Sequence, residues 1–182
     1  MKIQTPLTKD KLAGLKAGDL VYITGDIYTA RDAAHKKIIN LIEAGKEIPI
    51  TLKDSIIYYV GPTPNKPNQP IGACGPTTSY RMDSFMPTLL KHGLSGTIGK
   101  GARSNQVKKL LKEYKSIYFQ AIGGTAAFLS KFVVASELIA FPELQSEAIR
   151  KLTVKDFPVF VTYDIYGNDL IESEVKKYKT PN

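Results

Sequence analysis

Strand-like and helix-like segments alternate along almost the whole chain, and this alternation limits the fold more than any other feature. Apolar runs typical of strands lie at residues 19–24, 55–60, 117–122 and 157–163. Segments with a helical period lie at residues 29–44, about 78–92 and 106–114, and directly after a Gly-Gly turn at 123–124. We expect Pro87 to kink or break the second of these helices and Ser104 to be the N-cap of the third. The first has an apolar stripe made of Ala30, Ala34, Ile38, Leu41 and Ile42. Because the two kinds of element interleave, we predict a layered α/β or mixed β/β/α domain.

Chain length and one proline-rich segment indicate the domain organisation. The 182 residues suit a single domain over residues 1–182, large enough to bury a core without a metal or a disulfide. Residues 61–70 contain four prolines, which lack a backbone donor and fix φ. Since apolar runs flank this segment, we predict an extended surface loop inside the domain.

A single cysteine, Cys74, limits the redox and metal chemistry. It excludes an internal disulfide, and one thiol cannot by itself hold an iron–sulfur cluster or a structural zinc ion. If such a cofactor takes part in the function, another chain must supply most of its ligands. The N-terminus has no apolar signal core, and no apolar run approaches the length of a membrane span. We therefore expect a cytoplasmic protein that binds no metal on its own.

The formal net charge of +8 leaves several kinds of partner open. Nucleic acid, an acidic protein or a small anionic substrate would each fit it. A single-stranded nucleic acid would need stacking side chains, for which the candidates are Tyr58, Tyr59, Tyr118 and Phe119. These aromatic residues fit strand cores better, and the lysines fall on solvated helix faces. We expect no nucleic-acid partner and keep this reading as an alternative.

The first of three segments suited to an anion surrounds Arg31. Thr29 is a candidate N-cap, with Asp32 three residues later as in a capping box, so Arg31 falls in the first helical turn. A cation there opposes the positive end of the helix dipole, unless an anion is bound at the helix start. The alternative is that Arg31 pairs with Asp26 or Asp32.

The second segment is the Gly-Pro-Thr-Thr-Ser-Tyr-Arg stretch at 75–81. It predicts a tight turn into a helix, with Arg81 in the first turn and the hydroxyls of Thr77, Thr78 and Ser79 nearby. The alternative is an ordinary helix start in which Arg81 pairs with Asp83.

The third segment places Lys100 between two glycines, which permit close backbone approach. It lacks the spacing of a phosphate-binding loop, so we exclude a nucleotide site of that type; the alternative is a flexible turn with a solvated lysine. Two arginines and a lysine at such positions suit a small dicarboxylate, because each guanidinium can hold a carboxylate through two hydrogen bonds.

Together these segments resemble signature sequences of class I fumarate hydratase. The match is to its C-terminal or beta-subunit part, which is shared with L(+)-tartrate dehydratase beta subunits. The quoted residues are the stretches at 29–35, 75–83 and 98–101, followed by Gly-Gly-Thr-Ala-Ala at 123–127 and Asp-Phe-Pro-Val at 156–159. They occur in family order within a family-like core of about residues 18–169.

The resemblance implies a swivelling β/β/α domain with mixed sheets that closes over a [4Fe-4S] cluster. An alpha subunit would carry this cluster through three cysteines, and this chain would be the beta subunit of a hetero-oligomer. The implied reaction is the reversible hydration of fumarate to malate. L(+)-tartrate dehydration to oxaloacetate is the alternative, and an orphan scaffolding domain is a non-enzyme alternative.

The resemblance also implies roles for individual residues. Arg31, Arg81 and Lys100 match the substrate-binding cations, and Thr77 matches the residue proposed as the base. Thr78 lies beside it as a substrate-binding residue and as the fallback for the base. His35 lies in a matching segment and shares a helix face with Arg31; a role in orienting the substrate or the helix start and a purely structural role both stay open.

Overall fold

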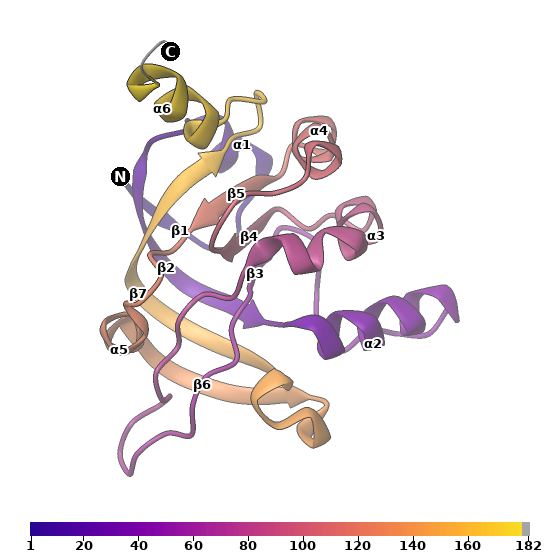
Figure 1. Ribbon diagram of the computed structural model, residues 1–182. Coiled ribbons are helices and arrows are strands. Elements are labelled where there is room, and N and C mark those ends of the chain that lie inside the picture. Colours follow the sequence, from indigo (N-terminus) through magenta and orange to yellow (C-terminus); the bar gives the residue numbers. More distant parts are fainter. Residues whose placement is uncertain (180–182) are drawn as a thin grey trace.

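The computed structural model describes residues 1–179 and contains one sheet of seven strands in the order β1-β2-β3-β4-β5-β7-β6 (Figure 1). The strands are β1 (Lys2–Gln4), β2 (Leu20–Thr29), β3 (Ile56–Tyr58), β4 (Gly96–Gly99), β5 (Ile117–Gln120), β6 (Val133–Ala140) and β7 (Ile149–Tyr163). The α-helices are α1 (Lys9–Ala13), α2 (Asp32–Glu43), α3 (Met86–Lys91), α4 (Asn105–Tyr114), α5 (Ala126–Leu129) and α6 (Leu170–Tyr178). The 3₁₀ helices are η1 (Ser79–Phe85), η2 (Ser130–Phe132) and η3 (Pro142–Glu147). This arrangement confirms the predicted mixed α/β class.

The strands close on themselves through β7. Strands β1 to β5 are parallel to their neighbours, whereas β7 is antiparallel to β2, β5 and β6. Because β2 pairs with both β3 and β7, the pairings run in a closed cycle through β2, β3, β4, β5 and β7. The side chains within this cycle form the main apolar core, which includes Ile23, Tyr58, Phe119 and Phe157.

Helices α2, α3 and α4 lie together on one side of the sheet (Figure 1). The predicted apolar stripe of α2 is buried at Ala34 and Ile38, which pack with Tyr59 and Met82 in a second core cluster. The predicted N-cap of α4 is confirmed, since the Ser104 hydroxyl accepts a hydrogen bond from the Val107 N–H. The proline-rich segment at 61–70 is an exposed irregular loop, as predicted.

The predicted boundary between β2 and α2 is wrong at both sides. Strand β2 continues through Gly25 and ends at Thr29. Its pairing with β7 shifts register between Ile23 and Gly25, and the φ of +116° at Gly25 accommodates this bulge. Thr29 therefore does not cap a helix; its hydroxyl accepts from the Arg150 N–H and donates to the Ala148 carbonyl of the neighbouring chain segment. Helix α2 begins only at Asp32.

The helix predicted at about 78–92 is two helices. The first is the 3₁₀ helix η1, and Pro87 lies in the first turn of α3, consistent with the break expected there. Strands β1, β4 and β6 and helices α1 and α6 were not predicted; β4 lies in the segment before Lys100 for which only a glycine-flanked loop was expected. Strand β6 is an edge strand whose six apolar residues are interrupted by Ser136 and Glu137, so its sequence has neither a continuous apolar run nor a period-2 alternation. Among residues 1–179, no helix combines the length and apolar character required to cross a membrane.

Replacing Gly25 by alanine tests the bulge in β2. A Cβ at this position would overlap the Thr5 hydroxyl, and the positive φ adds strain, so we expect a loss of about 1–3 kcal/mol in the free energy of unfolding. Gly14→Ala is the control, because Gly14 has φ of −82° and its nearest neighbouring atom is 3.8 Å from the added Cβ. Equal stability of the two variants in urea titration would contradict this account of β2.

Candidate functional site

The predicted site residues gather at the carboxyl ends of the parallel strands. Arg31 follows β2, Lys100 follows β4, and the Gly123-Gly124 turn comes shortly after β5. Thr77 lies beside the residue that follows β3, since its N–H donates to the Tyr59 carbonyl at 2.7 Å. Ligands of open parallel sheets commonly bind at this edge.

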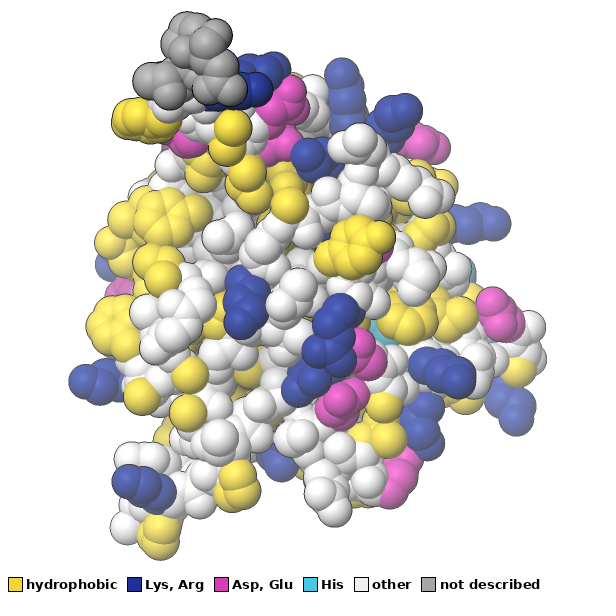
Figure 2. Space-filling view, in the orientation of Figure 1, with side chains coloured by type: hydrophobic (Ala, Val, Ile, Leu, Met, Phe, Trp, Pro, Cys, Tyr) yellow, Lys and Arg dark blue, Asp and Glu magenta, His cyan; other side chains and the backbone are white. Residues whose placement is uncertain are grey.

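The two arginines meet at one carboxylate. Arg81 donates from Nε and Nη2 to the two oxygens of Asp32, at 3.0 and 2.7 Å. Arg31 Nη2 lies 3.7 Å from the same Oδ2 atom. Two guanidinium groups that are 50 positions apart in sequence, one at the N-cap of α2 and one in η1, are therefore neighbours. In Figure 2, dark blue and magenta side chains adjoin at the middle of the visible face, over the region where α2 begins.

The ion pairs of these two arginines differ in part from the ones predicted as alternatives to an anion site. Arg31 pairs with Asp32, which was one of its two predicted partners. Its second partner is Glu147, at 3.5 Å, and not the predicted Asp26. It is the N-cap of α2 and does not lie in the first turn. Glu147 also accepts from the Ala33 N–H at 2.9 Å, so the anion at this helix start is a side chain of the protein itself. Arg81 pairs with Asp32 and not with Asp83.

Backbone hydrogen bonds fasten Lys100 beside the threonines. The Lys100 N–H donates to the Thr77 carbonyl at 3.1 Å, and the Ser79 N–H donates to the Lys100 carbonyl at 2.9 Å. Thr78 and Lys100 thereby form a parallel bridge. Gly99 is required here, because a Cβ at that position would overlap the Ser79 hydroxyl.

The three cations differ in how they are compensated. Arg31 and Arg81 have carboxylate partners, whereas the ammonium of Lys100 makes no ion pair within residues 1–179. Arg81 has 49% of its side chain exposed, and Thr78 is exposed beside it. The site is thus an open surface. That the Lys100 Nζ atom points to the two guanidinium groups stays a prediction.

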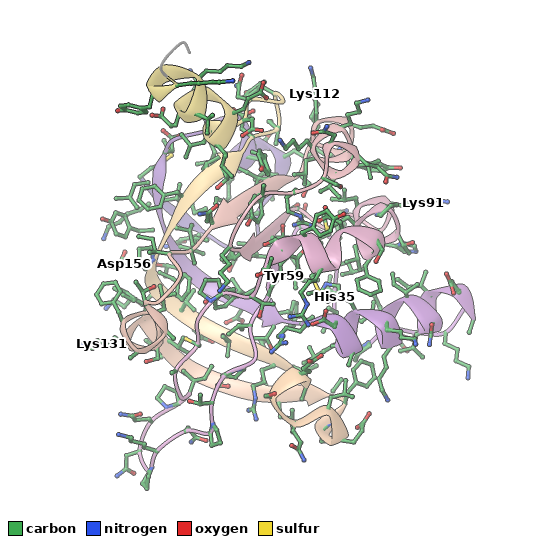
Figure 3. The ribbon with its side chains drawn as sticks, in the orientation of Figure 1. His35, Tyr59, Lys91, Lys112, Lys131 and Asp156 are labelled. Carbon is green, nitrogen blue, oxygen red and sulfur yellow. The ribbon has the colours of Figure 1, made fainter. Side chains whose placement is uncertain are left out.

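His35 is completely buried beneath the start of α2. Its Nδ1 atom lies 2.8 Å from the Arg31 carbonyl, and its ring stacks on Phe85 and meets Tyr59 edge-on (Figure 3). Burial lowers the pKa of His35 to about 4, and the hydrogen bond to the Arg31 carbonyl opposes this shift without cancelling it. A neutral, buried imidazole supports the Arg31 backbone and does not face the open surface. This geometry favours a structural role, or one in orienting the helix start, over direct contact with a substrate.

Sequence reasoning missed a buried ion pair behind the site. The Arg103 side chain is fully buried, and its Nε donates to Asp83 Oδ1 at 2.6 Å. The other oxygen of Asp83 accepts from the Ser104 N–H at 2.7 Å. The position of Arg103, three residues after Lys100, was the available signal. Glu147 carried no such signal, because only the tertiary fold brings it to Arg31.

The stacking surface that the nucleic-acid alternative requires is absent from these residues. Tyr58, Tyr59, Tyr118 and Phe119 are all 0% exposed and belong to the cores of the sheet. Lys91, Lys112 and Lys131 lie at the periphery, well apart from one another (Figure 3). The positive charge of the chain therefore does not combine with exposed aromatic rings at these positions.

Cys74 is unsuited to hold a metal cluster. It is buried, and burial raises the pKa of its thiol to about 12, so the thiolate that ligates iron is disfavoured. In the described part of the chain, no group of three or more His, Cys, Asp or Glu side chains is arranged to hold a metal ion. The residues of this chain therefore do not fit the cluster that the resemblance implies.

Comparison with known proteins gives a consistent set of relatives. A family model described as "Fumarase C-terminus" matches residues 1–174. "Fumarate hydratase class I, anaerobic" of Escherichia coli (strain K12) is 44% identical over 157 residues, 85% of this chain and 29% of that protein. "Fumarate hydratase 2" of Leishmania major is 39% identical over 172 residues, 92% of this chain and 30% of that protein.

A Methanocaldococcus jannaschii protein, whose name proposes an L(+)-tartrate dehydratase beta subunit, is 39% identical over 177 residues. The alignment covers 94% of this chain and 91% of that protein. The chain thus spans less than a third of the two fumarate hydratases and nearly all of this archaeal relative.

The buried state of His35 predicts a specific loss of stability in acid. Its pKa in the folded chain, about 4, lies below the unfolded value of 6.5, so only the unfolded chain takes up this proton between those values. Stability from this group is complete above pH 6.5 and falls by about 3 kcal/mol toward pH 4. We expect His35→Phe to flatten this part of the unfolding free energy curve and His92→Gln to leave it unchanged. Parallel curves for wild type and His35→Phe would contradict the burial.

Proposed function

The chain belongs to the fumarase C-terminus family, and from this premise we propose that it supplies the carboxylate-binding half of an iron–sulfur hydro-lyase site. The proposed reaction is the reversible hydration of fumarate to malate. The observation that carries the proposal is the meeting of Arg31 and Arg81 at the strand edge where Lys100 and Thr77 also lie.

The cations of the site would act on the charge that develops during the reaction. In the dehydration direction, loss of a proton next to a carboxylate places negative charge on that carboxylate. Arg31, Arg81 and Lys100 would stabilise this charge more strongly than that of the ground state. Asp32 binds the Nε and Nη2 donors of Arg81 and so fixes the plane of this guanidinium, and its remaining N–H donors would bind the substrate.

Thr77 is the proposed base. A hydroxyl is a poor base in water and needs activation by its surroundings. Its backbone is joined directly to Lys100, and positive charge nearby favours the deprotonated oxygen. We propose that an aspartate of a companion chain assists this step, and that Thr78 binds the substrate.

A companion chain, here called the alpha subunit, would hold the [4Fe-4S] cluster. The open surface of the site supports this proposal, and the described residues offer no ligand set of their own for the cluster. It also accords with the relatives that are more than three times as long as their matched part. A reducing compartment such as the cytoplasm suits both the cluster and the unpaired Cys74.

L(+)-tartrate dehydration to oxaloacetate is the second candidate. The archaeal relative named for this reaction is matched over 91% of its length, which favours it specifically. Both substrates are C4 dicarboxylates, so the two arginines and the lysine would serve either one.

The function is tested by reconstituting the chain anaerobically with its alpha subunit and measuring turnover of fumarate and of both tartrate enantiomers. We expect fumarate hydration by the pair and none by this chain alone. Arg81→Ala should lower kcat/KM by about a thousandfold, because a donor to the developing charge is lost. Lys176→Ala is the control, since this lysine is a cation of helix α6, away from the site, and pairs with Glu172 (Figure 1). Full activity of Arg81→Ala would remove the proposed site.

Valine, which has the shape of threonine without the hydroxyl, separates the roles of the two threonines. We expect Thr77→Val to lower kcat by about 10²- to 10⁴-fold with little change in KM, as loss of a base does. Thr78→Val should chiefly raise KM. Steady-state kinetics of the reconstituted pair measure both, and the reverse pattern would assign the base to Thr78.

A further inference from the structure

The buried ion pair of Arg103 and Asp83 joins the two segments that carry Arg81 and Lys100. Asp83 lies in η1, two residues after Arg81, and Arg103 follows Lys100 by three residues. Because the Asp83 carboxylate binds both the Arg103 side chain and the Ser104 backbone, it fixes η1 against the whole 100–104 connection.

The surroundings of Arg103 restrain its guanidinium on several sides. Nη1 lies 3.3 Å from both the Tyr59 hydroxyl and the Thr97 hydroxyl. The guanidinium carbon lies 5.4 Å from the Tyr59 ring centre and 5.3 Å from that of Tyr118. Arg103 thereby contacts residues of β4 and β5 and the residue that follows β3, the three parallel strands under the site.

Tyr118 adds a second connection between the same two segments. Its hydroxyl lies 2.9 Å from the Ser79 hydroxyl and donates to the Gly101 carbonyl at 2.8 Å. Ser79 precedes Arg81 by two residues, and Gly101 directly follows Lys100. The front of the site is thus joined by backbone hydrogen bonds, and its rear by Arg103 and Tyr118.

We propose that Arg103, held by Asp83, is a positioning residue that sets the separation of Arg81 and Lys100 and so matches the site to a dianion of fixed length. A charge this deeply buried is costly, and an apolar pair of similar volume often serves stability equally well. Unlike an apolar side chain, the planar guanidinium makes directional hydrogen bonds to Asp83, Tyr59 and Thr97 at the same time, and so fixes their relative positions. The nature of the dianion rests on the proposed function, whereas the role of Arg103 in holding the two segments together rests on the contacts described above.

The test uses the double variant Arg103→Met/Asp83→Asn in the reconstituted pair, which removes both buried charges together. We expect a melting temperature close to that of the wild type, a KM for fumarate raised at least tenfold, and a smaller change in kcat. In an Arg81→Ala background the same double change should cost little more, because Arg103 acts through Arg81. Unchanged KM in a folded double variant, or fully additive losses, would overturn the proposal.

Two further variants separate positioning from general stability. Lys108→Met removes the partner of Asp169 from another partly buried ion pair on α4, and it should change stability without changing KM. Arg103→Lys keeps the charge but not the fork, so it should fold and give an intermediate KM. If the double variant fails to fold, the Arg103→Lys result decides, and a wild-type KM there would overturn the proposal.

A readout without turnover keeps the two proposals distinguishable. In NMR spectra of the purified chain, we expect the Arg81 Nε–H signal to be resolved and slow to exchange, because Asp32 accepts its proton. The signal should broaden or exchange rapidly in the double variant and in Arg103→Lys, but not in Lys108→Met. If the wild-type pair fails to hydrate fumarate, the proposed function falls, and this signal alone decides the role of Arg103. An unaltered Arg81 signal in all variants would overturn it.

Discussion

The antiparallel ladder between β2 and β7 is the interaction on which the rest of the structure depends. It pairs Leu20 with Phe160 at one end and Tyr28 with Lys151 at the other, and it closes the parallel strands into a cycle. The same ladder brings Glu147, just before β7, to the first turn of α2, 114 positions away from Ala33 in sequence. The orientation of Arg31 is therefore a product of the closed sheet.

The site combines compensated and uncompensated charge in a way that suits reversible binding. Two guanidinium groups share Asp32, which limits their mutual repulsion and holds them in place before any ligand arrives. Lys100 has no carboxylate partner within residues 1–179, so net positive charge remains available. Since the surface is open, we expect these interactions to reach full strength only when a companion chain excludes water from them.

Local sequence patterns predicted the fold class, the α4 cap and the buried stripe of α2, because those features depend on residues close together in the chain. They failed where a distant segment decided the outcome. Thr29 has the chemistry of an N-cap, yet β7 takes its hydroxyl, and the helix starts three residues later. Arg81 had a nearby candidate partner in Asp83, but Arg103 occupies that carboxylate and Asp32 receives Arg81. In each case a partner near in sequence was replaced by one from a distant segment that the tertiary fold brings close.

Main-chain hydrogen bonds, not side chains, join the Thr77 to Ser79 stretch to Lys100. Peptide groups are the same for every residue type except proline, so the path of this connection tolerates variation in what it displays. Tyr80, which is 65% exposed and lies between the buried Ser79 and the exposed Arg81, illustrates this freedom. Evolution could thus alter which small acid such a scaffold prefers by exchanging a few outward groups, with no need to redesign the framework that aligns the reactive ones.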